Sequence, residues 1–177
     1  MMASPDLLPI SNDEFIADVH ALAALIAADD WRPDFIVGIG RGGLVPAVYL
    51  SHATGIALLS VDHSSQVPSF GAELLTRLAS KSRAGVRLLL VDDINDSGRT
   101  LAHLRTSLAT AGGAMDHIRV AVLIDNVSSS QSVDYRARRI DRKTEIRWFV
   151  FPWEAMAADD AVLAEAAEMH RAVGSRE

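Results

Sequence analysis

The chain has 177 residues, no cysteine and a formal net charge of −6 at pH 7. The missing cysteines exclude disulfide frameworks, thiol nucleophiles and cysteine zinc sites. The acidic balance disfavours nucleic-acid binding, because affinity for a polyanion needs clustered Lys and Arg. No apolar run approaches the ~20 residues that span a bilayer, and the first ten residues lack the basic flank of a targeting signal. We therefore expect a cytoplasmic protein with a single domain over residues 1–177 and no membrane or nucleic-acid partner.

Apolar patterning predicts helices and strands that alternate along the chain. A capping box at Ser11–Glu14 begins a first amphipathic helix that runs to about Asp29. The further elements predicted in chain order are a strand at 35–39, a helix at 44–53, strands at 56–61 and 86–91, a helix at 100–110, strands at 118–124 and 148–151, and a helix from 159 to about 173. Continuous apolar strands between helices predict an α/β fold, a doubly wound and mostly parallel sheet with helices on both faces.

The segment 62–82 interrupts this alternation. It mixes Ser, Gln, Pro and Gly and has one weak helical patch at 72–78. Clusters of such residues between periodic segments are typical of loops. We expect a long, mobile loop here.

The first polar turn, Gly38–Gly43, satisfies the pattern G-x-G-x-x-G, and Asp62 follows at about the spacing of a ribose-binding acid. This favours a dinucleotide site, although too few residues follow the turn for a full dinucleotide fold with a substrate domain. The alternative is a tight turn that needs glycine for positive φ. Arg41, a cation among exposed amides, would suit a phosphate or pyrophosphate in such a turn.

The second polar turn, Asp92–Thr100, carries more chemistry. Ser97–Thr100 begin a helix, so their free N–H groups and hydroxyls suit a monophosphate, and a side chain at Gly98 would fill the phosphate space. Asp92 and Asp93 would repel that phosphate, so they should face hydroxyl donors or a divalent cation. A sugar 5-phosphate has this distribution. The alternative is a capped acidic loop as in receiver domains, where the acidic pair follows the first strand rather than the third.

The segment Asp92–Thr100 resembles the phosphoribosyl-diphosphate motif of type I phosphoribosyltransferases, two acids followed by Asp-Ser/Thr-Gly and Thr. Arg41-Gly42-Gly43 resembles the pyrophosphate loop of this family. Trp148–Glu154 is similar to the base-covering segment of the purine branch, the xanthine-guanine and hypoxanthine phosphoribosyltransferases. The likeness covers roughly residues 35–154 and implies a small hood built from the terminal segments. We also expect a homo-oligomer.

The resemblance implies that a purine nitrogen displaces pyrophosphate at C1 of phosphoribosyl diphosphate, with Mg²⁺ as cofactor. It implies that Asp92 and Asp93 hold the ribose hydroxyls, that Asp93 also binds the metal, and that Asp96 moves a proton at the base. The residues implied to bind the phosphates are Arg41, Gly42, Gly43, Ser97, Gly98, Arg99 and Thr100. A developing ribosyl cation would be stabilised by the nearby carboxylates.

On the base side, the resemblance implies that Trp148 stacks on the base, that Phe149 presents main-chain groups, and that Glu154 orients metal-bound water. An ordinary buried aromatic is the alternative for Trp148. The purine branch has a lysine near the end of the fourth strand, where this chain has Asp125 followed by Asn126. An ionised carboxylate only accepts hydrogen bonds, so Asp125 predicts a base with a donor at that edge.

Two further alternatives concern the whole chain and its basic run. A regulator that senses phosphoribosyl diphosphate without base chemistry is the second functional hypothesis, and Asp96 favours the enzyme. The run Arg136–Lys143 alternates arginine and lysine with acids, which predicts a charged surface or an oligomer contact. The six histidines show no metal-ligand spacing.

Overall fold

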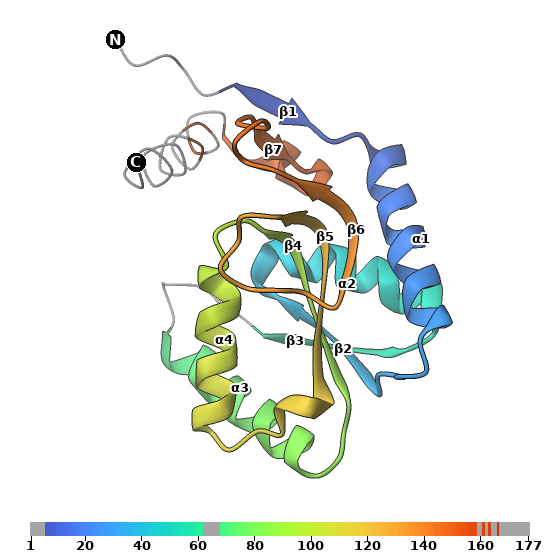
Figure 1. Cartoon of the computed structure of the whole chain (residues 1–177), viewed down its shortest axis with the longest axis vertical. Coiled ribbons are helices and arrows are strands. Elements are labelled where there is room, and N and C mark those ends of the chain that lie inside the picture. The colour runs from blue at the N-terminus through green and yellow to red at the C-terminus, as the bar shows by residue number, and fades with distance from the viewer. Residues whose placement is uncertain (1–5, 62–67, 159–160, 162, 164–165, 167–177) are drawn as a thin grey trace. The chain divides into compact units, whose positions relative to one another are not determined.

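The computed structural model describes residues 6–61 and 68–158, together with 161, 163 and 166 (Figure 1). Its largest feature is a five-stranded sheet in which every neighbouring pair is parallel. The strands, in spatial order, are β3 (Ala57–Val61), β2 (Phe35–Ile39), β4 (Leu88–Asn95), β5 (Ile118–Asn126) and β6 (Tyr135–Ile140). The helices are α1 (Asn12–Ala28), α2 (Gly40–Thr54), α3 (Pro68–Arg83) and α4 (Arg99–Thr110), with a 3₁₀ turn, η1 (Met115–His117). Parallel strands that alternate with helices confirm the expected α/β class.

The strand order places the two polar turns, Gly38–Gly43 and Asp92–Thr100, beside each other. From β2 the chain moves outward to β3 and then returns to pair β4 on the other side of β2. A parallel sheet aligns the carboxyl ends of its strands, and ligands of such sheets bind where the order reverses. The turns that follow β2 and β4 therefore meet at one edge of the sheet.

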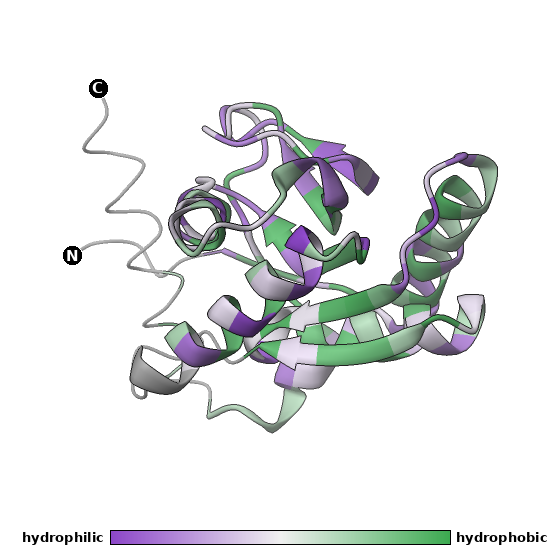
Figure 2. Ribbon diagram, turned by 90° about the horizontal axis from the view of Figure 1, so that it is seen from below, coloured by the Kyte–Doolittle hydropathy of each residue, from purple (hydrophilic) through white to green (hydrophobic). Residues whose placement is uncertain are grey.

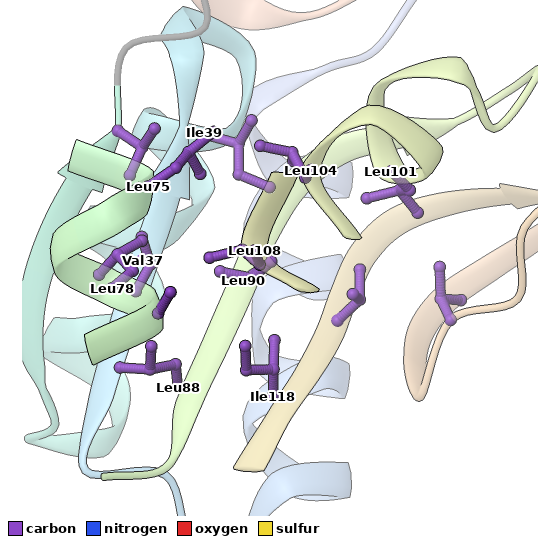
Figure 3. Close-up of a cluster of buried hydrophobic side chains, with 14 of the residues drawn as sticks. Val37, Ile39, Leu75, Leu78, Leu88, Leu90, Leu101, Leu104, Leu108 and Ile118 are labelled. Carbon is purple, nitrogen blue, oxygen red and sulfur yellow. The ribbon is translucent and has the colours of Figure 1, made fainter. Parts of the chain in front are cut away.

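Helices α3 and α4 cover one face of the sheet through a continuous apolar cluster (Figure 3). Leu75 and Leu78 of α3 and Leu104 of α4 are at most 5 % exposed and pack with strand residues such as Val37 and Leu90. Figure 1 shows α2 on the opposite side of the sheet, and Figure 2 shows the apolar strands between the layers. The central strands are thus buried on both faces, which explains their continuous apolar runs.

The expected loop at 62–82 is wrong over its larger part, because α3 spans Pro68–Arg83. Residues 62–67 lie outside the described residues. Pro68 suits the first position of a helix, where no N–H donor is needed, and the apolar side of α3 follows the helical spacing Leu75, Leu78, Ala79. The Ser and Gly residues that suggested a loop are interspersed with these apolar residues along the helix.

Other boundaries also differ from the sequence expectation, and three of them concern the polar turns and the acids. The strand predicted at 86–91 continues to Asn95, and the strand predicted at 118–124 continues to Asn126, so the acids of both segments still lie on strands. Helix α2 begins at Gly40 rather than at residue 44. The basic run contributes an unexpected edge strand, β6, in which Arg138 forms an ion pair with Asp18 of α1.

The chain divides into two compact units: residues 18–140 contain the five-stranded sheet, and residues 1–17 with 141–177 form the other. In the latter, β1 (Leu7–Pro9) pairs in parallel with β7 (Trp148–Val150), followed by the 3₁₀ turn η2 (Pro152–Met156). The capping box is confirmed, since Glu14 N–H donates to Ser11 Oγ at 3.2 Å and Ser11 N–H to Glu14 Oε2 at 2.8 Å. The two terminal segments thus belong to one compact unit, and its expected role as a hood stays a prediction. The helix predicted at 159–173 lies almost wholly outside the described residues. No helix in the described part of the chain is long and apolar enough to cross a membrane.

Candidate active site

A pocket of about 310 Å³ lies at the carboxyl ends of β2 and β4. Its lining comes only from the two polar turns and the strand ends before them. The lining residues are Ile39, Gly40, Arg41, Gly42, Asp92, Asp93, Ile94, Asn95, Asp96, Ser97, Gly98, Arg99, Thr100 and Leu101. Of the phosphate- and ribose-binding residues predicted from the sequence, Gly43 alone is not in this lining. The fold therefore brings two segments together that lie about fifty residues apart in the chain.

The first turn of α2 forms one wall of the pocket. Gly40 has φ 55°, in the left-handed region that favours glycine. Gly42 and Gly43 are required for a different reason, which is the close approach of α2 to β4. A Cβ on Gly42 would lie 2.3 Å from Asp93 Oδ2, and a Cβ on Gly43 would lie 2.1 Å from the Val91 carbonyl oxygen. Arg41 is exposed in the same helical turn, so the expected pyrophosphate loop is the start of a helix.

Two adjacent carboxylates lie at the end of β4. Asp92 is 9 % exposed, and its Oδ1 accepts a hydrogen bond from the Asp93 N–H at 3.1 Å. Asp93 Oδ1 accepts from the Ile94 N–H at 2.7 Å. Burial raises the pKa of Asp92 well above its usual value, and the negative charge of Asp93 adds to this shift. The pair thus favours a proton or a cation beside it.

The donor set of this pair fits Mg²⁺. This ion prefers oxygen ligands and commonly binds one or two carboxylates while water and substrate phosphates complete its shell. The described residues contain no group of three metal-ligating side chains, so a protein-only cage is not formed there. Glu154, expected to orient metal-bound water, accepts a hydrogen bond from the Phe151 N–H at 2.7 Å and thereby caps η2 in the terminal unit.

The second polar turn ends at the N-terminus of α4. Gly98 is its N-cap with φ 83°, and the Ser97 hydroxyl oxygen accepts from the Arg99 N–H at 3.3 Å. The N–H groups at a helix start suit an anion, and phosphate binding by Ser97–Thr100 stays a prediction. That a side chain at position 98 would fill the phosphate space stays a prediction, and the structure adds a second reason for glycine. A Cβ there would lie 2.5 Å from Ser130 Oγ, so it would collide with the loop after β5.

That loop, residues 127–132, braces the second polar turn through Asn95, which the sequence analysis did not single out. Asn95 is 2 % exposed. Its side-chain amide donates to Asp125 Oδ1 at 2.9 Å and to the Gln131 carbonyl at 2.7 Å, while its Oδ1 accepts from Ser129 Oγ at 2.8 Å. The sequence signal for this role was an amide within an otherwise acidic motif. Once such an amide is buried, it needs hydrogen-bond partners for both its donors and its acceptor.

Asp125 belongs to this bracing network. It is 5 % exposed, and besides Asn95 its carboxylate has two arginines of β6 nearby, with Oδ2 3.7 Å from an Arg136 Nη and 3.9 Å from Arg139 Nε. Asp125 is not part of the pocket lining. Contact between this carboxylate and a base stays a prediction.

The residues expected to cover the base lie in the terminal unit. Phe149 is buried, with the Arg142 guanidinium 5.1 Å from its ring centroid. Trp148 is half-buried, and its indole N–H lacks a hydrogen-bond partner among the described residues. Nearby, the Phe151 and Trp153 rings are stacked at 4.7 Å. The base-binding roles of Trp148 and Phe149 stay predictions.

Comparison with known proteins gives a consistent result. The family model for the phosphoribosyl transferase domain matches residues 10–159. The crystal structure of a purine phosphoribosyltransferase from Pyrococcus horikoshii is similar, with 27 % identity, a TM-score of 0.63, and coverage of 86 % of this chain and 97 % of that one. A xanthine-guanine-hypoxanthine phosphoribosyltransferase from Helicobacter pylori has 19 % identity and a TM-score of 0.60, with coverage of 83 % and 92 %, and shows the likeness of fold.

Proposed function

The chain belongs to the phosphoribosyl transferase domain family, and from this premise we propose that it transfers the 5-phosphoribosyl group of phosphoribosyl diphosphate to a purine base and releases pyrophosphate. Phosphoribosyl transfer from this donor is the activity of the family. The observation that supports our assignment of the site is one pocket lined both by an acidic pair, of which Asp92 is buried, and by a helix start. A phosphorylated sugar with a free diol has the complementary chemistry.

In this proposal, each end of the donor has its own partners. The ribose hydroxyls donate hydrogen bonds to Asp92 and Asp93, because an ionised carboxylate can accept hydrogen bonds but cannot donate them. The 5-phosphate binds the N–H groups and hydroxyls of Ser97–Thr100. Arg41 and the adjacent main chain at Gly42 and Gly43 bind the diphosphate. The carboxylates then lie near the sugar, where positive charge develops as the C1–oxygen bond breaks.

We assign Mg²⁺ to the side of the pocket where Asp93 lies. The ion would share its shell between that carboxylate, water and the donor's oxygens, and when bound it supplies positive charge that stabilises the departing diphosphate. Asp93 suits this role because its Oδ2 faces the backbone of α2 at Gly42, where no side chain intervenes. Glu154 would act only through metal-bound water, and its capping bond to Phe151 sets its orientation.

The choice of a purine base rests on two resemblances. The Pyrococcus horikoshii protein is called a purine phosphoribosyltransferase, and the base-covering segment Trp148–Glu154 resembles that branch. We propose that Asp96, which lines the pocket, exchanges a proton with the base and that Trp148 stacks on it. We also propose that residues 1–177 act as one domain, in the cytoplasm, within a homo-oligomer.

A pyrophosphate-release assay with phosphoribosyl diphosphate, Mg²⁺ and a panel of purine and pyrimidine bases tests the proposal. We expect release with at least one purine and none with pyrimidines. Asp96→Asn should lower kcat by on the order of 100-fold or more while the donor still binds, because a proton-transfer group is lost. Asp92→Asn, the matched variant in the same pocket, should mainly weaken donor affinity. Donor binding without release with any base would support the sensing regulator instead.

A further inference from the structure

Asn126 lies directly beside Asp96 at the carboxyl edge of the sheet. Strands β4 and β5 pair in parallel with Asn95 opposite Asp125, so the next residue of each strand end is adjacent as well. Asn126 is 6 % exposed. Its side-chain nitrogen lies 3.0 Å from the Asp96 carbonyl oxygen and 3.3 Å from Asp96 Oδ1. It is thus a buried side chain that contacts both the main chain and the carboxylate of one pocket residue.

The chemistry of the partners fixes the orientation of this amide. The Asp96 carbonyl and an ionised carboxylate only accept hydrogen bonds, so the NH₂ group of Asn126 must face them. On the other side, Asn126 Oδ1 accepts from the Ser128 N–H at 3.2 Å, which an NH₂ group would not do. A rotated amide would lose bonds at both ends. The side-chain nitrogen of Asn126 therefore donates to both the Asp96 carbonyl and the Asp96 carboxylate.

The loop after β5 makes a neighbouring contact that does not involve the Asp96 carboxylate. Ser130 Oγ donates to the Ser97 carbonyl at 2.9 Å, and the Ser130 N–H does so at 3.3 Å. Ser130 thereby holds the backbone of the second polar turn, one residue after Asp96. Asn126 differs from Ser130 because it also fixes the direction of an acidic side chain that lines the pocket.

We propose that Asn126 is a positioning residue for phosphoribosyl transfer, which holds the Asp96 carboxylate in the direction needed for proton exchange with the base. This inference rests on the proposed function and adds a residue to it. A carboxylate fixed by a neutral donor loses little orientation entropy on reaching the reactive geometry, and misplacement of a reacting group by about 1 Å can cost roughly 100-fold in rate.

Steady-state kinetics of Asn126→Ala, with Ser130→Ala as the matched control, test this role. We expect Asn126→Ala to lower kcat by roughly 10- to 100-fold with little change in KM for phosphoribosyl diphosphate, because Ser130 still holds the backbone of the phosphate-binding turn at Ser97. Ser130→Ala should leave kcat within about threefold, since the Ser130 N–H still holds the Ser97 carbonyl. Equal effects of both variants on KM and on melting temperature would show a purely structural loop and overturn the inference.

A double-mutant cycle shows whether Asn126 affects kcat through Asp96 or independently of it. In the Asp96→Asn background, Asn126→Ala should lower kcat by no more than about twofold, because the group it positions is already removed. Additive losses would overturn the positioning role while transfer by the unmodified enzyme still supports the proposed function. If the unmodified enzyme transfers to no base, the proposed function fails and this inference fails with it.

Discussion

At the scale of single residues, the pocket combines groups that are unfavourable in the empty protein. Asp92 is buried beside a second carboxylate, and this arrangement raises its pKa well above the usual value. Such a group is stabilised by a cation or by hydroxyl donors, which the proposed ligand would supply. The buried carboxylate therefore lowers the stability of the ligand-free protein and raises its affinity for the proposed ligand.

We expect Asp92→Asn to stabilise the ligand-free protein, and to do so more at high pH. Because the folded-state pKa lies above the usual value of 3.8, the destabilisation by Asp92 is absent below that value and complete above the raised pKa. The gain in unfolding free energy of the variant should thus grow as the pH rises from about 4 through the raised pKa of Asp92. Urea unfolding at several pH values measures it. The exposed Asp30→Asn is the control, and a gain that shrinks with rising pH would contradict the argument.

Gly43 tests the close approach of α2 to β4. A Cβ at this position would lie 2.1 Å from the Val91 carbonyl and 2.9 Å from Asp92 Cα, and neither backbone atom moves easily. We expect Gly43→Ala to lower the unfolding free energy by about 1–3 kcal/mol, as overpacking does elsewhere. Denaturant unfolding measures this loss, with His52→Ala at an exposed position of the same helix as control. Equal stability of the two variants would mean that α2 has room to move.

At the scale of elements, α3 shows how packing stabilises a segment of loop-like composition. Its residues Leu75, Leu78 and Ala79 form one buried face against the sheet and α4, while Glu73 and Arg77 pair on the exposed face. Most helical stability in proteins comes from such amphipathic packing rather than from intrinsic propensity. Tertiary contacts likewise decide the structure of β6, because its three arginines lie on a strand that pairs with β5.

Leu78→Ala separates a packed helix from a loop. Because Leu78 is 5 % exposed within the apolar cluster, the truncation should cost about 2–5 kcal/mol of unfolding free energy. Arg77→Ala changes the adjacent residue, whose side chain is 71 % exposed, and should cost less than about 1 kcal/mol. Urea denaturation of both variants gives the comparison. If both variants lost similarly little unfolding free energy, residues 68–83 would behave as the loop expected from their composition.

At the scale of the whole molecule, the reversal of strand order creates the site. Neither polar turn forms a pocket alone, and only the pairing of β2 with β4 places α2 against the acidic pair. A ligand that binds both turns should therefore stabilise the sheet unit as a whole, because it binds the folded chain and not the unfolded one.

Thermal unfolding measures this linkage. Phosphoribosyl diphosphate with Mg²⁺ should raise Tm, with a stabilisation of about 2.7 kcal/mol at a ligand concentration of 100 times Kd. Removal of Mg²⁺ with a chelator should reduce the shift, and Asp93→Asn should lose this metal-dependent part. Asp30→Asn, which changes an exposed acid outside the pocket, serves as control. A shift in Asp93→Asn that still depends fully on Mg²⁺ would remove that carboxylate from the metal site.

The sequence by itself determined the α/β class, the central strands and both polar turns, because apolar periodicity, glycines and acids at fixed spacing are local signals. It also determined most of the pocket lining, since each turn carries its own chemistry. Tertiary structure alone decided the rest. Whether α3 is a helix depends on the sheet it covers, and the reasons for Gly42, Gly43 and Gly98 lie in backbones or loops distant in the chain. The contacts of Asn95, Asp125 and Asn126 depend on the pairing of β4 with β5, which no local pattern encodes.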